Sequence, residues 1–266
     1  MKDILEEIVA NKQRELEQWK QFIPMKQLFG IIEYEGAMSR EVPSMKQALL
    51  DSNTGIIAEF KRKCPSKGWI KQDGKAREIP LKYESNGAAA LSIHTDNTYF
   101  GGYDEFIQEA RATGVGLPIL YNNFVIDEYQ LFQAKYAGAS AVLLIAAILT
   151  KEQCHSLISL AHQLNMEVLL EIHSIEDLEY IVCEPDMYGI NNGIIGTFVT
   201  DVEKSFKMVE MLPKNVVKVS EGGINNPEMV KQLRTVGYKG FLIGEYFMKE
   251  ENPGETLKQF VAAINK

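Results

Sequence analysis

Eight short apolar runs recur along the chain, and an amphipathic segment follows each of them. The runs occupy residues 55–60, 89–93, 118–121, 141–145, 167–172, 187–190, 216–220 and 240–243. The amphipathic segments lie near residues 79–86, 103–113, 127–137, 150–164, 174–183, 201–212, 226–236 and 254–265. Continuous apolar runs that alternate with helices are typical of parallel strands covered on both faces. Eight such units predict an α/β fold, the (β/α)8 TIM barrel, rather than an open doubly wound sheet.

The first 50 residues precede this repeating pattern. An apolar stripe at helical spacing predicts a helix at the start of the chain, formed by Ile4, Leu5, Ile8 and Val9. Residues 24–43 contain several prolines and glycines and are predicted to be irregular. Ser44 can then cap a short helix that runs through Leu50. The chain is therefore predicted as a single barrel domain, residues 1–266, with residues 1–50 as an N-terminal helical extension packed on the barrel.

Several helix starts carry recognisable signals. A hydroxyl residue followed by Gln or Asp three positions later indicates a cap, and proline is favoured in the first turn. These signals occur at Thr150 with Gln153, at Ser174 with Asp177, and at Pro227.

Composition excludes several classes of function. The chain has 266 residues, of which 45% are hydrophobic, so it can bury a full core. A net charge of −8 argues against a nucleic-acid partner. No apolar run approaches the roughly 18 residues of a membrane span, and the charged N-terminus lacks the apolar core of a signal peptide. The sequence therefore predicts a cytoplasmic protein without nucleic-acid or membrane partners.

The cysteines do not form a pattern that indicates a disulfide framework or a metal site. Cys64, Cys154 and Cys183 are widely spaced and odd in number. A dinucleotide site is also disfavoured, because no Gly-x-Gly-x-x-Gly follows the first apolar run.

Charged residues gather where the predicted strands end. Glu59 and Lys61 lie on alternate positions of the first strand and would point to the same face. Such a pair can be a surface cross-charge pair, but paired charges that point into a core are rare unless they are functional. Glu171 and Glu221 end the fifth and seventh strands. Active sites of these barrels lie at the carboxyl ends of the strands, so one lysine and three carboxylates are predicted to meet there.

Glycines mark the ends of the last two predicted strands. Gly222 and Gly223 follow the seventh strand, and Gly244 with Glu245 follows the eighth. Glycine lets backbone N–H groups approach a ligand, and barrels commonly bind phosphate at this place. The same glycines could also be ordinary turn residues. If the chain forms the predicted barrel, these glycines indicate a phosphate site. The negatively charged Glu245 side chain must then point away from the phosphate.

The chain resembles the indole-3-glycerol phosphate synthase family over nearly its whole length. The segments that carry the resemblance are the leading helix 4–9, Ile57-Ala58-Glu59-Phe60-Lys61 with Pro65-Ser66-Lys67-Gly68, Ala90-Leu91-Ser92-Ile93, Tyr99-Phe100-Gly101-Gly102, Glu167-Val168-Leu169-Leu170-Glu171-Ile172-His173, Gly189-Ile190-Asn191-Asn192, Val219-Ser220-Glu221 and Ile243-Gly244-Glu245. Enzymes of this family decarboxylate, close and dehydrate 1-(2-carboxyphenylamino)-1-deoxyribulose 5-phosphate without a metal or organic cofactor. The resemblance therefore implies a carbon–carbon lyase of tryptophan biosynthesis that binds a small phosphosugar, as a monomer or weak homo-oligomer.

The resemblance also implies roles for individual residues. Lys61 matches a substrate-contacting lysine and is a candidate proton donor beside Glu59. Glu171 matches a general base or acid of the dehydration, and Asn191 and Glu221 match further active-site residues. The remaining predicted contacts with substrate or phosphate are Cys64, Ser66, His94, Asn122, Gly222, Gly223, Gly244 and Glu245. No metal ligands are predicted.

The chain departs from the family pattern at positions that matter for chemistry. Asn122-Asn123-Phe124 stands where the family has Lys-Asp-Phe. Asn191-Asn192-Gly193 stands where the family has Asn-Asn-Arg or Asn-Ser-Arg, so Gly193 replaces the family's arginine. Asparagine cannot supply a proton or a positive charge at neutral pH. Serines of the family are replaced by Cys64 and Gly222, and the usual leucine before Thr95 is His94, which could equally be a buried strand histidine.

Three functions are consistent with these residues. The first is a synthase with rearranged acid catalysis, which the retained Glu59, Lys61 and Glu171 favour. The second is a paralogue with altered chemistry on a related amino-sugar phosphate, which Asn122 and Gly193 favour. The third is a catalytically impaired barrel that binds a phosphosugar, which the intact acidic residues disfavour.

Overall fold

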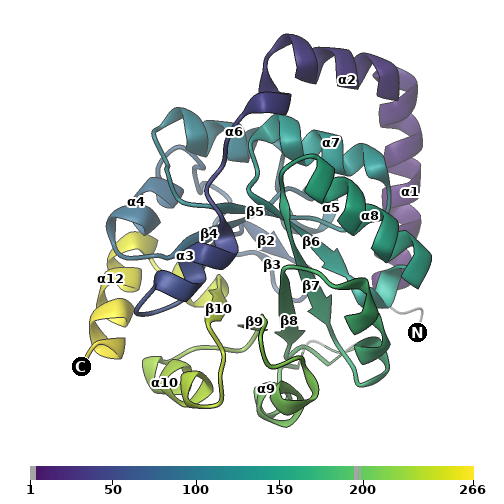
Figure 1. The fold of residues 1–266 in the computed structure, drawn as a ribbon. Coiled ribbons are helices and arrows are strands. Elements are labelled where there is room, and N and C mark those ends of the chain that lie inside the picture. The colour runs from purple at the N-terminus through teal and green to yellow at the C-terminus, as the bar shows by residue number, and fades with distance from the viewer. Residues whose placement is uncertain (1–3, 195–196, 198) are drawn as a thin grey trace.

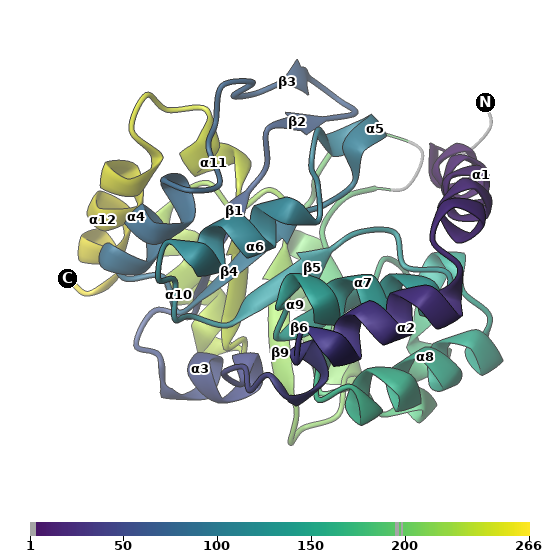
Figure 2. The ribbon, with the colours of Figure 1, turned by 90° about the horizontal axis from the view of Figure 1, so that it is seen from above.

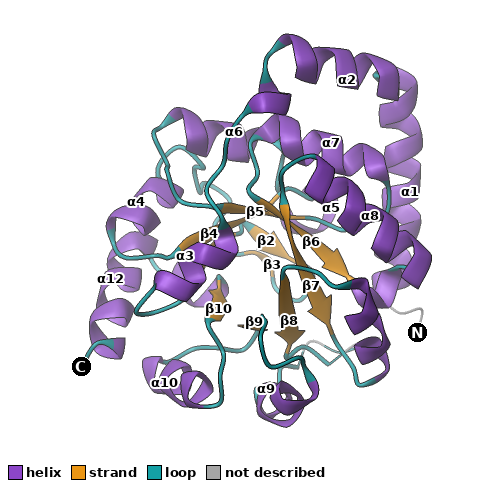
Figure 3. Ribbon diagram, viewed as in Figure 1, coloured by secondary structure: helices purple, strands orange, loops and turns teal. Residues whose placement is uncertain are grey.

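The computed structural model describes residues 4–194, 197 and 199–266. Eight parallel strands close into a barrel in the order β1-β10-β9-β8-β7-β6-β5-β4 (Figures 1 and 3). Their bounds are Ile56–Phe60 (β1), Ala90–His94 (β4), Ile119–Asn122 (β5), Ala141–Ile145 (β6), Glu167–Ile172 (β7), Met187–Asn191 (β8), Val217–Glu221 (β9) and Gly240–Ile243 (β10). Each strand coincides with one predicted apolar run to within two residues. The predicted (β/α)8 TIM barrel is confirmed.

Helices surround the barrel and connect successive strands. The connecting helices are α4 (Ile79–Ser85), α6 (Glu105–Ala112), α7 (Glu128–Ala137), α8 (Lys151–Gln163), α9 (Glu203–Met208) and α10 (Pro227–Thr235), and α12 (Pro253–Ile264) follows the last strand. Short helices α5 (Asn97–Phe100) and α11 (Glu245–Met248), the 3-10 turns η1 (Ala37–Ser39), η2 (Ala146–Ile148) and η4 (Val209–Met211), and the hairpin of β2 (Lys63–Cys64) and β3 (Gly68–Trp69) add to the loops. The predicted helix at 174–183 is instead the 3-10 helix η3 (Glu176–Cys183).

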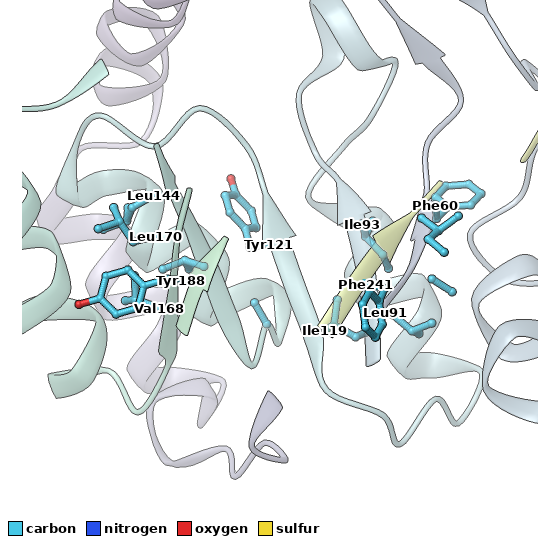
Figure 4. Packing of buried hydrophobic residues seen from close by; sticks show 14 of the residues in the cluster. Phe60, Leu91, Ile93, Ile119, Tyr121, Leu144, Val168, Leu170, Tyr188 and Phe241 are labelled. Carbon is cyan, nitrogen blue, oxygen red and sulfur yellow. The ribbon is translucent and has the colours of Figure 1, made fainter. Parts of the chain in front are cut away.

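Alternation along each strand separates two apolar layers. Side chains that point outward pack against the helices, as Figure 4 shows for Phe60, Leu91, Tyr121, Leu170 and Phe241 among others. Side chains that point inward fill the barrel; they include Ile57, Ala90, Leu120, Leu143, Leu169, Met187, Val219 and Leu242. A strand covered on both faces needs apolar residues at every position, which is why these strands read as continuous runs.

Three helices precede the barrel: α1 (Ile4–Phe22), α2 (Met25–Tyr34) and α3 (Met45–Asp51). The prediction of an irregular segment at 24–43 is wrong, because Leu28 and Ile32 are buried on one face of α2, which contacts α7. Gly30 does not break α2; a methyl group there would meet open space. Helix α3 contacts β4 and β9 and lies at the end of the barrel opposite the β2–β3 hairpin (Figure 2).

Most predicted helix starts have the expected geometry. The Ser44 hydroxyl accepts from Gln47 N at 3.0 Å, Thr150 and Gln153 form a complete capping box, and Pro227 begins α10. At Ser174 one half of the predicted capping box is present: the Asp177 carboxylate accepts from the N–H groups of His173 and Ser174 at 2.7 and 3.0 Å.

A buried ion pair attaches α1 to the barrel. Lys12 is 1% exposed, and its Nζ lies 2.8 Å from Asp96 Oδ2 and 2.7 Å from Glu15 Oε2. Asp96 is fully buried and also accepts from Tyr99 N at 2.7 Å, as the cap of α5. Because a buried carboxylate without its cation is strongly destabilising, Lys12 is a structural residue.

Lys12→Met is expected to lower the free energy of unfolding by about 3 kcal/mol, because Asp96 would stay buried without its ammonium partner. Urea denaturation monitored by circular dichroism measures the change. Lys75→Met is the matched control, since Lys75 pairs with Glu78 at the surface and its loss should cost less than about 1 kcal/mol. Equal stability of the two variants would contradict a structural role for Lys12.

Candidate active site

The inward alternation of the strands continues into the polar residues at their carboxyl ends. Ile57 points into the barrel, so Glu59, two residues on, does the same. Leu169 and Glu171 are related in the same way on β7, as are Val219 and Glu221 on β9. Because side chains alternate along a strand, the carboxylates of Glu59, Glu171 and Glu221 all point into the barrel at its carboxyl end.

These side chains line a cavity of about 590 Å³ at the carboxyl end of the barrel. Of the predicted site residues, the cavity is lined by Glu59, Lys61, Ser66, His94, Asn122, Glu171, Asn191, Glu221, Gly222, Gly223, Gly244 and Glu245. Cys64 is the exception: it is buried outside the cavity wall, and its Sγ lies 3.2 Å from the Ser66 hydroxyl. Cys64 therefore lies behind Ser66, which itself lines the cavity.

Glu59 lies between two donors. Its Oε2 is 2.6 Å from Lys61 Nζ, and its Oε1 is 2.8 Å from His94 Nε2. Burial by itself raises the pKa of Glu59, but Lys61 and His94 outweigh it and lower the pKa to about 2. Burial likewise lowers the pKa of Lys61, and the carboxylate of Glu59 more than reverses this effect. Glu59 is therefore ionised and Lys61 protonated at neutral pH.

Glu171 and Glu221 are in opposite protonation states. Burial raises the pKa of Glu171, but His173, whose Nε2 is 2.5 Å from Glu171 Oε1, together with hydrogen bonds from Asn191 and Glu221 lowers the pKa overall. Among the described residues no cation pairs with Glu221, and burial and the negative charge of Glu171 raise its pKa well above the usual value. One carboxyl group can thus accept a proton while its neighbour holds one to donate.

His173 was predicted to end the fifth strand beside Glu171, but no role was assigned to it. It lies two positions after Glu171, on the same side of the chain, and this spacing was the available signal. Burial lowers the pKa of His173, but the contact with Glu171 raises it overall, which favours the imidazolium. His173 is thus the cation that keeps Glu171 ionised.

Two glycines make room for the carboxylates. A Cβ at Gly189 would lie 1.8 Å from Glu221 Oε1, and a Cβ at Gly244 would lie 1.8 Å from Glu59 Oε2. Both distances are far inside contact, so only glycine fits at these two points. Gly244 was predicted as a phosphate contact, whereas Gly189 was missed because a glycine inside a strand can have several explanations.

The loops after β8 and β9 meet beside the carboxylates. Asn191 Oδ1 accepts from Gly193 N at 2.8 Å. Lys204 Nζ donates to the carbonyl oxygens of His173, Asn191 and Gly193 at 3.0, 2.9 and 2.6 Å. Lys204 therefore fixes the ends of β7 and β8 through the backbone and is committed to these carbonyls.

Gly222 and Gly223 both have positive φ, 81° and 74°, after β9. This left-handed backbone is available to glycine at little cost. Glu245 turns away to Lys67, with 2.5 Å between Oε1 and Nζ. Gly222, Gly223 and Glu245 line the cavity, and their contact with a phosphate stays a prediction.

The other end of the cavity is apolar. It is formed by Phe100, Phe124, Leu143 and Ile145 together with Ile4, Leu5 and Ile8 of α1. The contribution of α1 could not be predicted, since the sequence does not show which element its stripe packs against. An aromatic ring fits this wall, while charged groups fit the carboxylate side.

The cation that the resemblance places on β5 has no direct substitute. Asn122 Nδ2 donates to Ser92 Oγ at 3.1 Å. Lys63 does not reach the cavity, because its Nζ donates to Thr98 O at 2.8 Å and lies over the Trp69 ring. Within residues 4–194, 197 and 199–266, no helix is long and apolar enough to cross a membrane, and no group of three or more His, Cys, Asp or Glu residues could hold a metal ion.

Comparison with known proteins agrees with this geometry. The family model of Indole-3-glycerol phosphate synthase matches residues 5–260. The indole-3-glycerol phosphate synthase of Bacteroides thetaiotaomicron is 56% identical over 99% of this chain and 100% of its own length. That of Carboxydothermus hydrogenoformans is 38% identical over 97% of this chain and 99% of its own length.

Solved structures show the same fold at low sequence identity. A 3-hexulose-6-phosphate synthase aligns with a TM-score of 0.62 and 13% identity over 79% of this chain and 99% of its own. The tryptophan synthase subunit alpha of Legionella pneumophila aligns with a TM-score of 0.61 and 13% identity over 83% and 98%. The full-length relatives, and not these fold matches, determine the family: the chain belongs to the indole-3-glycerol phosphate synthase family and is a lyase of that type.

Proposed function

We propose that this enzyme converts 1-(2-carboxyphenylamino)-1-deoxyribulose 5-phosphate, or a close analogue, by decarboxylation, ring closure and dehydration. The observation that carries the proposal is geometric: the carboxyl groups of Glu59, Glu171 and Glu221 meet the Lys61 ammonium in one cavity, and His173 Nε2 lies 2.5 Å from Glu171 Oε1. The proposal extends to a cytoplasmic enzyme that binds a small phosphosugar as a monomer or weak homo-oligomer.

Each step has a group of the required protonation state. Ring closure forms a bond between the aryl carbon and the sugar carbonyl carbon, and Lys61 donates the proton that the carbonyl oxygen takes up. The aryl carboxylate then leaves as CO₂, and its bonding electrons return to the ring. In the dehydration, Glu221 protonates the departing hydroxyl group and Glu171 accepts the proton lost from the adjacent ring carbon. Atoms balance to one CO₂ and one water.

The apolar wall and the glycine-lined end of the cavity indicate how the substrate would bind. The aryl ring would lie on the apolar wall of Phe100 and Phe124. The phosphate would lie against the backbone of Gly222, Gly223 and Gly244, with Ser66 opposite. Asn191, already oriented by Gly193, would contact the sugar hydroxyls.

A related amino-sugar phosphate is the second candidate substrate. The specific observation in its favour is the neutral Asn122 side chain in the cavity wall, hydrogen-bonded to Ser92, at the position where the family has a lysine. The two candidates differ in whether CO₂ is released.

Wild-type enzyme is expected to form fluorescent indole product from the carboxyphenylamino substrate, and Asn122→Lys to raise kcat/KM by about 10- to 100-fold by restoring a positioned acid. Indole fluorescence follows the reaction. Asn53→Lys adds the same charge at an exposed position away from the cavity and should leave the rate unchanged. Absence of product from both the wild type and Asn122→Lys would contradict the proposed reaction and favour the second substrate.

A further inference from the structure

His94 ends β4 at the edge of the cavity, and the strand register places it directly beside Asn122 of β5. Its side chain is only 9% exposed. Nε2 lies against Glu59, and Nδ1 is buried with no hydrogen-bond partner in the described part of the chain. Nε2 is thus already committed to Glu59 and Nδ1 is shielded from solvent, whereas the sequence predicted His94 as a substrate contact.

The orientation of the imidazole is fixed by packing. Its ring stacks on Phe100, with 4.0 Å between centroids and 4° between planes. Phe100 ends α5, whose cap Asp96 is held by Lys12. A ring clamped in this way keeps Nε2 directed at Glu59.

The contact with Glu59 determines which atom carries the proton. An ionised carboxylate only accepts hydrogen bonds, so the proton is on His94 Nε2, whichever charge the ring carries. The two oxygens of Glu59 then have one donor each, His94 on Oε1 and Lys61 on Oε2. The other charged or titratable groups that act on these side chains are Cys64 and Glu245 near Lys61, and Glu221 and Tyr83 near Glu59.

We propose that His94 is a positioning residue: it holds Glu59 ionised and oriented, so that Glu59 keeps the Lys61 ammonium protonated and directed into the cavity. The inference rests on the proposed function insofar as Lys61 is the acid of ring closure. It explains how acid catalysis can operate beside Asn122, which has no acidic proton to give. His94 acts through Glu59 and does not touch the substrate.

The alternative acids support this assignment. Lys67 is paired with Glu245, and Lys63 is turned toward Thr98 and Trp69. Lys61 is the ammonium that lines the cavity next to Glu59, and its protonated state depends on the charge of that carboxylate. Without His94, one oxygen of a nearly fully buried carboxylate would lose its donor, which favours the neutral form of Glu59.

The first test compares His94→Leu with His94→Gln. The glutamine amide can still donate to Glu59, whereas leucine cannot. His94→Leu is expected to lower kcat about 100-fold while KM changes less than about threefold, and His94→Gln is expected to stay within about fivefold of the wild type. His162→Leu, at a half-exposed histidine paired with Asp186, is the matched control.

The second test does not need turnover. In protein labelled with ¹³C at the glutamate carboxyl groups, the Glu59 resonance is assigned by its loss in Glu59→Gln. It should not titrate between pH 4 and about 8 in the wild type or His94→Gln, but should titrate in this range in His94→Leu. If His94→Leu does not fold, His94→Asn, whose amide is too short to reach Glu59, takes its place with the same expectation.

The outcomes separate the two proposals. Product formation with a kcat loss in His94→Leu and rescue in His94→Gln supports the positioning role. Equal loss in both variants, or a Glu59 resonance that is unchanged in His94→Leu, overturns it. If the wild type forms no indole product, the proposed reaction fails, and the Glu59 titration alone then decides whether His94 controls this carboxylate.

Discussion

Glu171→Gln is expected to abolish indole formation, with kcat lowered by roughly 10³-fold. Glutamine preserves the shape and can still accept the hydrogen bond from His173, but it cannot take up a proton. The substitution also removes a negative charge that helps to raise the pKa of Glu221, so that Glu221 would hold its proton less firmly. The acid and the base of the dehydration are thus both affected.

Fluorescence of the product measures turnover, and calorimetry with inorganic phosphate measures binding at the glycine end, which should change less than about threefold. Glu179→Gln is the control, because Glu179 is an exposed carboxylate paired with Lys151 outside the cavity. Unchanged turnover in Glu171→Gln would remove Glu171 from the proposed mechanism.

Gly189→Ala should have an effect of similar size by a purely steric route. The new methyl group would be placed 1.8 Å from Glu221 Oε1 and 3.4 Å from a methyl carbon of Leu169. Because Glu221 is nearly fully buried, its carboxyl group can move only at the expense of its packing. We expect kcat to fall by about 100-fold and the free energy of unfolding to fall by about 1–3 kcal/mol.

The Glu221→Ala background tests the cause of this effect. Removing the carboxyl group removes the clash, so adding Gly189→Ala to Glu221→Ala should cause little further loss of stability. Urea denaturation of the two single variants and the double variant gives the interaction energy. Additive losses would show that Gly189 is required for the strand itself rather than to make room for Glu221.

The strands were predictable because burial on both faces leaves a strong local signal. Each apolar run became a strand, and the carboxyl ends of those strands identified Glu59, Glu171 and Glu221. Helix α2 was missed because its apolar face, with Leu28 and Ile32, is short and interrupted by Gly30, and tertiary contacts with α1, η1 and α7 stabilise it. The 3-10 conformation of η3 and the cap by Asp177 likewise depend on the loop around them.

The sequence by itself determined the barrel, the inward face of each strand and therefore which polar residues meet at its carboxyl end. These follow from the period of two along a strand and from the order of the elements, which are properties of the local chain. The tertiary structure decided the ion pairs and the protonation states of those residues. It pairs Glu59 with His94 and Glu171 with His173, buries Glu221 beside the negative charge of Glu171, and closes the apolar end with α1. Protonation state depends on burial and on charges brought from distant positions in the chain, and no local pattern records these.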